Sequence, residues 1–128
     1  MSIKVSIDAS GGDFGFPVTI NAGINALKAY DDLLVNFVGD QRGIEKELKN
    51  NALFFKFQSR IEITHASEVI NMDDSPSVAL RHKKDSSMRV AINLVKNGDA
   101  DACVSAGNTG ALMSIARFVL KTISGVDR

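Results

Sequence analysis

The stretch Gly107-Asn108-Thr109-Gly110 has residue types and a spacing suited to chemistry. It joins a short apolar run at 102–106, which predicts a strand, to an apolar run at 111–120, which predicts a helix. Its two glycines allow a tight turn and a close approach of a ligand to the backbone, and Asn108 or Thr109 can cap the helix. The free N–H groups of a first helical turn, together with the helix dipole, bind anions. We therefore predict an anion site at Gly107, Asn108, Thr109 and Gly110; the alternative is a well-capped turn with no ligand.

Asp8 and His65 are two further candidates. Asp8 opens a loop that contains Gly11 and Gly12, directly after a segment of alternating apolar residues. His65 follows the apolar segment 61–64. In parallel sheets, ligands bind beyond the carboxyl ends of the strands, so both side chains are expected at the ligand edge. The alternatives are turn formation for Asp8 and a hydrogen bond to the loop backbone for His65.

Basic residues are concentrated between positions 81 and 89, where Arg81, Lys83, Lys84 and Arg89 occur within nine residues. On a chain without net charge, such a cluster predicts a local positive patch. It could meet phosphates or an acidic protein partner. The alternative is a solvated helix face.

Strands alternate with helices along the chain. Strands are predicted at 3–7, 33–38, 61–64 and 102–106, the last of them buried on both faces. Helices are predicted from Pro17, around 44–48, at 77–84, at 88–95 with Ser86 or Ser87 as its cap, and at 111–120. The segments 52–60 and 66–76 have no clear periodicity. This order predicts a parallel sheet with helices on its faces.

Composition excludes several classes of protein. The 128 residues suit one domain, and the 15 basic and 15 acidic residues cancel, so no overall charge indicates nucleic acid. The single cysteine excludes an internal disulfide and fits a reducing cytosol. The N-terminus lacks the features of a signal peptide, and no apolar stretch is long enough to span a membrane. Zinc-ligand spacing, a Walker A motif and a dinucleotide-binding glycine pattern are also absent from the sequence, so no metal or cofactor is predicted.

Several long runs resemble the PlsX-type phosphate acyltransferases of bacterial phospholipid synthesis. The two longest are Ser75 to Ala91 and Asp101 to Met113, and the shorter ones are at 8–13, 38–40, 65–70 and 125–128. The resemblance spans the whole chain. Ser10 stands where the family usually has methionine, and family members are far longer. The chain therefore resembles only their N-terminal part, which leaves catalytic groups of the remainder outside it.

The resemblance implies transfer of a fatty acyl group from acyl carrier protein to inorganic phosphate in the cytoplasm. It also implies a three-layer α/β/α fold of the isocitrate and isopropylmalate dehydrogenase type, a homodimer, possible peripheral membrane association, and no metal or nucleotide. In this reading, 107–110 holds phosphate with an amide hydrogen of Asn108. Asn108, Asp8 and His65 are the catalytic candidates. The patch of Arg81, Lys83, Lys84 and Arg89 would receive the carrier protein. Two alternatives remain: a phosphotransacetylase-like enzyme that uses acyl-CoA, and a non-catalytic binding module.

Overall fold

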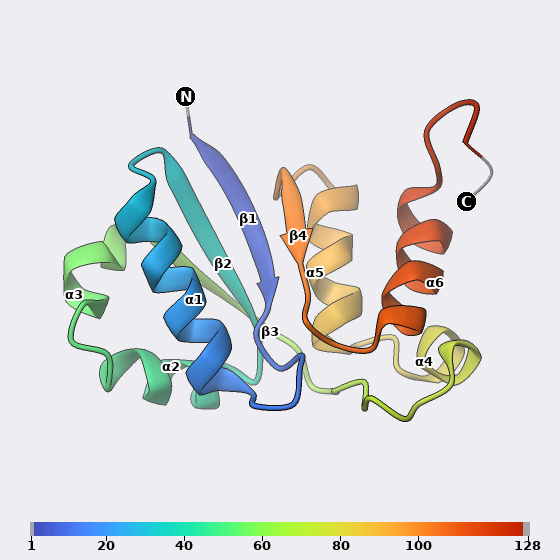
Figure 1. Cartoon of the computed structure of the whole chain (residues 1–128), viewed down its shortest axis with the longest axis horizontal. Coiled ribbons are helices and arrows are strands. Elements are labelled where there is room, and N and C mark those ends of the chain that lie inside the picture. Colours follow the sequence, from blue (N-terminus) through green and yellow to red (C-terminus); the bar gives the residue numbers. More distant parts are fainter. Residues whose placement is uncertain (1, 127–128) are drawn as a thin grey trace.

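A parallel sheet is the centre of the computed structural model, which describes residues 2–126. Its strands are β1 (Ile3–Asp8), β2 (Leu33–Gly39), β3 (Ile61–His65) and β4 (Ala102–Val104), in the order β3-β2-β1-β4. Every pairing is parallel, so the carboxyl ends of the strands lie together at the bottom of Figure 1. The predicted α/β class with a parallel sheet is confirmed.

Three helices cover one face of the sheet: α1 (Phe16–Ala29), α2 (Gln41–Lys49) and the short α3 (Phe54–Phe57) (Figure 1). Their apolar sides and the facing strand residues form one core because burial removes these side chains from water. Its larger members are Ile20, Ile24, Leu27, Val35, Phe37, Ile44, Leu48 and Phe57. The ambiguous segment 52–60 forms α3 and the 3₁₀ helix η1 (Gln58–Arg60), and Phe57 fills the edge of this core.

Helix α5 (Ser87–Lys96) packs on the opposite face against β1, β2 and β4. Helices α4 (Pro76–His82) and α6 (Thr109–Leu120) pack against each other, and α6 also packs against α5. Their shared core contains Ala79, Met88, Ile92, Ala111 and Ile115. The sheet therefore lies between two helical layers, as predicted. Within residues 2–126, no helix has both the length and the apolar character needed to cross a bilayer.

The structure decides between the alternative caps at two helix starts. At α6, Asn108 is the cap: its Oδ1 accepts from the Ala111 N–H at 3.2 Å. At α5, Ser86 is the cap: its Oγ accepts from the Arg89 N–H at 3.0 Å. Both caps satisfy N–H groups that have no partner within their own helix.

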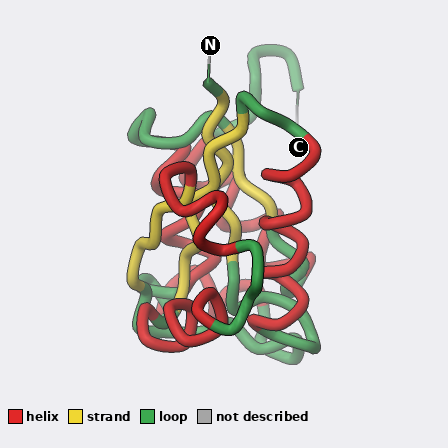
Figure 2. Tube along the Cα trace, turned by 90° about the vertical axis from the view of Figure 1, so that its left-hand side faces the viewer, coloured by secondary structure: helices red, strands yellow, loops and turns green. Residues whose placement is uncertain are grey.

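Loops collect at the carboxyl edge of the sheet. The segments after β1, β2, β3 and β4 all leave the strands on this side, and Figure 2, turned by 90°, again shows green loops at the bottom of the molecule. The segment 66–76, which has no clear periodicity, contains no helix before Pro76 and only one isolated bridge, between Glu68 and Ser86. Asp8, His65 and the turn at 107–110 all lie at this edge, as expected.

Strand β4 differs from its prediction in length and in burial. It ends at Val104 instead of residue 106, and Val104 is 56% exposed. The apolar run suggested burial on both faces, but β4 is an edge strand in residues 2–126 and α1 lies over β1 and β2. An apolar groove of about 450 Å³ therefore remains open. Its lining includes Val18, Ala22, Ala26, Tyr30, Val104 and Ala106.

Candidate anion site at the carboxyl edge of the sheet

The carboxylate of Asp8, the last residue of β1, is buried and only 2% exposed. The Ser87 hydroxyl, at the start of α5, donates a hydrogen bond to Oδ1, and the Ser105 hydroxyl donates to Oδ2 at 2.8 Å. Both oxygens therefore have donors, as a buried charge requires, and the N-terminal dipole of α5 adds to the stabilisation. Asp8 ties together β1, α5 and the segment after β4. A catalytic role for Asp8 stays a prediction.

The turn between β4 and α6 is tied to Asp8 through Ser105. The Gly107 N–H donates to Ser105 Oγ at 3.1 Å, while the Ser105 hydroxyl hydrogen goes to Asp8. The loop after β1 approaches the same place at Gly11. A Cβ atom on Gly11 would lie 2.7 Å from Asp8 Oδ2 and 3.2 Å from the Gly107 nitrogen. Only glycine fits there without displacing the carboxylate or the turn.

Thr109 and Gly110 carry the first backbone N–H groups of α6. Within residues 2–126, neither group has an acceptor at hydrogen-bond distance. Thr109 is exposed and Gly110 is half-buried, so both N–H groups stand at a helix N-terminus near the surface. This geometry suits an anion, because the helix dipole and the unpaired donors act together. Phosphate binding at 107–110 stays a prediction.

The Asn108 side chain makes hydrogen bonds that the sequence did not predict. Its amide donates to the carbonyl oxygens of Asn71, Met72 and Asp74, at 3.1, 3.3 and 2.8 Å, while its oxygen caps α6. An amide has two hydrogens, and both are engaged by these carbonyls. In this arrangement the Asn108 side chain tethers the loop at 71–74 and has no amide hydrogen left for another acceptor. A catalytic or phosphate-binding role for Asn108 stays a prediction.

Asn108→Ala should lower the free energy of unfolding by about 2 kcal/mol, because it removes both the helix cap and the loop tether. Asn108→Ser is the matched control: a serine oxygen caps equally well but cannot reach three carbonyls, so the expected loss is about 1 kcal/mol. Urea unfolding of the two variants measures the difference. Equal losses in the two variants would mean that the cap contributes nothing, and an Asn108→Ser protein as stable as wild type would mean that the contacts to 71–74 contribute nothing to stability.

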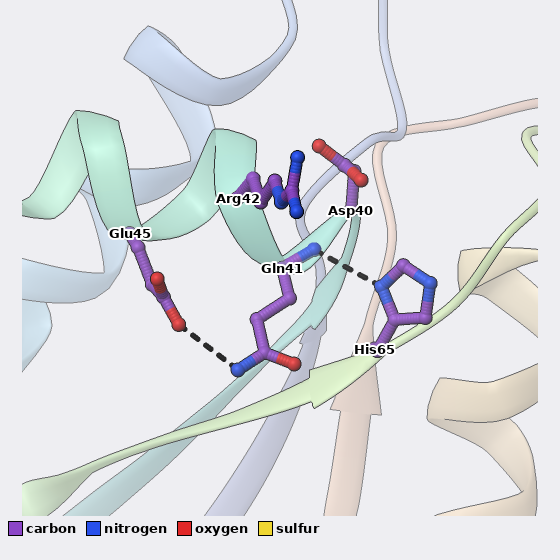
Figure 3. Close-up of a pocket in the computed structure, with 5 residues that line it drawn as sticks. All are labelled: Asp40, Gln41, Arg42, Glu45 and His65. Atoms are coloured by element: carbon purple, nitrogen blue, oxygen red, sulfur yellow. Dashed lines mark hydrogen bonds between the residues drawn. The ribbon is translucent and has the colours of Figure 1, made fainter.

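His65 lies in a different part of the edge. Its Nδ1 accepts from the Gln41 N–H at 3.1 Å, and it lines a shallow pocket of about 340 Å³ with Asp40, Arg42 and Glu45 (Figure 3). Strand β3 is two strands away from β1, and neighbouring strands are about 4.8 Å apart, so its backbone lies about 10 Å from β1. The structure does not bring His65 together with Asp8 or with the turn at 107–110. A substrate contact for His65 stays a prediction.

The four residues of the predicted basic patch do not form one free surface. Lys83 Nζ donates to Asp74 Oδ2 at 2.5 Å and to the Val69 carbonyl at 2.9 Å, so its charge is paired. Arg89 stacks over the Phe118 ring, 5.5 Å from its centroid. Arg81 and Lys84 are exposed. The run of basic residues thus has mixed roles, and partner binding by any of the four stays a prediction.

Lys83→Met should lower stability at neutral pH and change little in acid. The Lys83 hydrogen bond, followed by the one from the Asn71 N–H, holds the pKa of Asp74 below its ordinary value of 3.8. A lowered folded-state pKa stabilises the fold above the unfolded-state pKa, and this contribution is lost as pH falls through the folded value. The difference in melting temperature between Lys83→Met and wild type should therefore shrink as the pH is lowered from about 6 to about 2. The exposed Lys84→Met serves as control. A difference that does not vary with pH would contradict the assignment.

Sequence reasoning considered Ser87 only as a possible helix cap and did not single out Ser105, although the hydroxyl groups of both hold Asp8. Each lies at an element boundary, and its polar residue type there is the only available signal. Cys103 packs partly buried against the helices behind the sheet. Burial, and then the Asp8 charge, raises the pKa of its thiol. Among the residues described, no cluster of potential metal ligands occurs.

A family model described as fatty acid synthesis protein matches residues 3–128 of this chain. The chain belongs to this family. It is 65% identical over 128 residues to the phosphate acyltransferase of Ruthia magnifica and 63% identical over 131 residues to that of Vesicomyosocius okutanii. The phosphate acyltransferase of Hydrogenovibrio crunogenus is 52% identical. The resemblance to the PlsX-type phosphate acyltransferases is thereby confirmed. All of this chain is aligned, but it spans only 37–38% of the length of these relatives.

Proposed function

We propose that the full-length protein is an acyltransferase that moves a fatty acyl group from acyl carrier protein to inorganic phosphate. A phosphate oxygen attacks the thioester carbonyl carbon, the new C–O bond forms, the C–S bond breaks, and the thiolate leaves and takes up a proton. The products are acyl phosphate and free carrier protein. Three observations support this proposal: the family membership, the phosphate acyltransferase names of the relatives, and the geometry at the start of α6.

The unpartnered N–H groups of Thr109 and Gly110 are the observation that carries the phosphate site. They lie at the carboxyl edge of a parallel sheet, where ligands of such folds bind. Two N–H groups on a rigid helix would fix the phosphate next to the thioester, and much of the rate acceleration would come from this positioning. The parallel sheet between two helical layers supports the finer proposal of an isocitrate and isopropylmalate dehydrogenase-like fold. On family membership alone, we further propose a cytoplasmic homodimer with peripheral membrane association.

For the carrier protein, we propose a docking surface that retains Arg81, Lys84 and Arg89 but not the paired Lys83. Arg117 and Lys121 extend it, because both line one hollow with Phe118, and Lys121 Nζ lies 5.5 Å from that ring. Carrier proteins are acidic, so complementary charge would speed the encounter.

The decisive experiment uses the purified full-length protein with inorganic phosphate and either acyl carrier protein or coenzyme A as the acyl donor. Acyl phosphate is trapped with hydroxylamine and measured as hydroxamate. We expect phosphate-dependent product with the acyl carrier protein thioester. Product only from acyl-CoA would favour a phosphotransacetylase-like enzyme instead. No product from either donor, in a folded protein that binds phosphate, would favour a binding module.

A further inference from the structure

We propose that Asp8 and Ser105 form a positioning pair that sets the geometry of the turn at 107–110, a role that rests on the proposed phosphate site. Asp8 is buried, 2% exposed, and both of its carboxylate oxygens already accept hydrogen bonds from the protein. Its effect must therefore reach the site through its contacts. Ser105 is the contact that leads to the turn.

A chain of two hydrogen bonds connects the sheet to the turn. The Ser105 hydroxyl donates to Asp8 Oδ2 at 2.8 Å, and this fixes the direction of the hydroxyl. A lone pair of the same oxygen then faces the Gly107 N–H, which donates at 3.1 Å. The Gly107 N–H is thus bound to the protein, whereas, among the residues that the structure describes, the N–H groups of Thr109 and Gly110 have no acceptor at the start of α6. The bond to Ser105 gives the Gly107 N–H a structural role, and the N–H groups of Thr109 and Gly110 stay available to a ligand.

The carboxylate is a rigid reference point because both of its oxygens are held. The Ser87 hydroxyl, on α5, holds Oδ1, and α5 packs against the sheet. The carboxylate cannot rotate away from Ser105 without losing the bond to Ser87. Small displacements of a group that positions a reactant have large effects on rate, up to about 100-fold for 1 Å. We therefore expect loss of the pair to weaken phosphate binding and slow turnover, and to leave binding of the acyl donor nearly unchanged.

Ser87 provides a matched control within the same network. Like Ser105, it is a serine whose hydroxyl donates to a carboxylate oxygen of Asp8. Unlike Ser105, it lies at the start of α5 and makes no direct hydrogen bond to the turn, so it acts on the turn only through Asp8. Removing either hydroxyl costs Asp8 one donor, but only the Ser105 hydroxyl anchors Gly107.

The test compares Ser105→Ala, Ser105→Thr and Ser87→Ala in the full-length protein. Ser105→Ala should raise the KM for phosphate about tenfold, with the KM for the acyl donor nearly unchanged. Ser105→Thr, which keeps the hydroxyl, should restore the wild-type phosphate KM, and Ser87→Ala, which loosens Asp8 but leaves the Ser105 bond to Gly107 in place, should shift it clearly less than Ser105→Ala does. Equal shifts in Ser105→Ala and Ser87→Ala, or no shift in Ser105→Ala, would overturn the proposal.

Hydrogen exchange gives a second readout that does not depend on activity. Ser105→Ala should speed exchange of the Gly107 amide, whereas Ser87→Ala should change it clearly less, because the acceptor of the Gly107 N–H remains. Unchanged protection of Gly107 in Ser105→Ala would overturn the positioning pair even if the enzyme is active. A wild-type protein without phosphate-dependent turnover, but with the expected exchange pattern, would instead remove the proposed function and leave the pair as the anchor of the turn.

Discussion

Phe37→Ala should reduce the free energy of unfolding by about 3–5 kcal/mol, the largest loss of stability that we expect from a single substitution. Phe37 lies on β2 and is fully buried among the residues of α1 and α2. Its ring is also tightly enclosed, since a Cβ on Gly23 of α1 would lie 2.5 Å from two ring atoms. Truncation therefore leaves a cavity that the rigid sheet and helix cannot close. Urea unfolding followed by circular dichroism measures the loss.

Phe55→Ala is the control for this experiment. Phe55 lies on α3 and is 69% exposed, so its truncation should change stability by no more than about 0.5 kcal/mol. Both variants remove the same atoms, and the comparison isolates burial. Similar losses in the two variants would show that the core between α1 and the sheet is not packed as described.

Gly11→Ala should disturb both stability and the candidate site. The added Cβ would lie 2.7 Å from Asp8 Oδ2 and 3.2 Å from the Gly107 nitrogen, much closer than real Cβ contacts. Asp8 cannot move aside freely because Ser87 and Ser105 hold it. We expect a loss of about 1–3 kcal/mol, typical of an overpacked site, and changed amide resonances at 105–110.

The neighbouring Ser10→Ala is the control for Gly11→Ala. Ser10 lies in the same loop and is half-buried, and its substitution removes an atom rather than adding one. Its unfolding midpoint and its amide spectrum at 105–110 should stay close to those of wild type. A Gly11→Ala protein with wild-type stability and spectrum would mean that the loop after β1 does not press on the Asp8 carboxylate.

Local patterns predicted the elements well, because each depends on nearby residues. Alternation at 3–7 gave β1, and the periodic apolar residues of α1 and α5 gave the helical layers. The turn at 107–110 was identified from its glycines and its capping residues. By contrast, the hydrogen bonds of Asp8 reach Ser87, 79 positions along the chain, and Ser105, 97 positions along it. No local sequence pattern extends over such separations.

Predictions about the surroundings of an element were less successful, because they depend on what packs beside it. The apolar run at 102–106 was interpreted as a doubly buried strand, yet Val104 faces an open groove. Lys83 was counted as a free charge, although its partner Asp74 is only nine residues away. The loop at 69–74 has to fold back before this pair can form, and the sequence has no periodicity there that would predict its path.

The pairing of β4 with β1 has a consequence for the order of folding. Strands β1 and β2 are separated by one helix, whereas Ile7 pairs with Val104 from the other end of the chain. Closing the longer loop costs more chain entropy, and contacts of high sequence separation form late in small α/β domains. We therefore expect the candidate site, which needs Asp8 beside Ser105, to be assembled late in folding. Interactions that form after the transition state mainly control the rate of unfolding. We therefore expect loss of the bond between Asp8 and Ser105 to speed unfolding more than it slows folding.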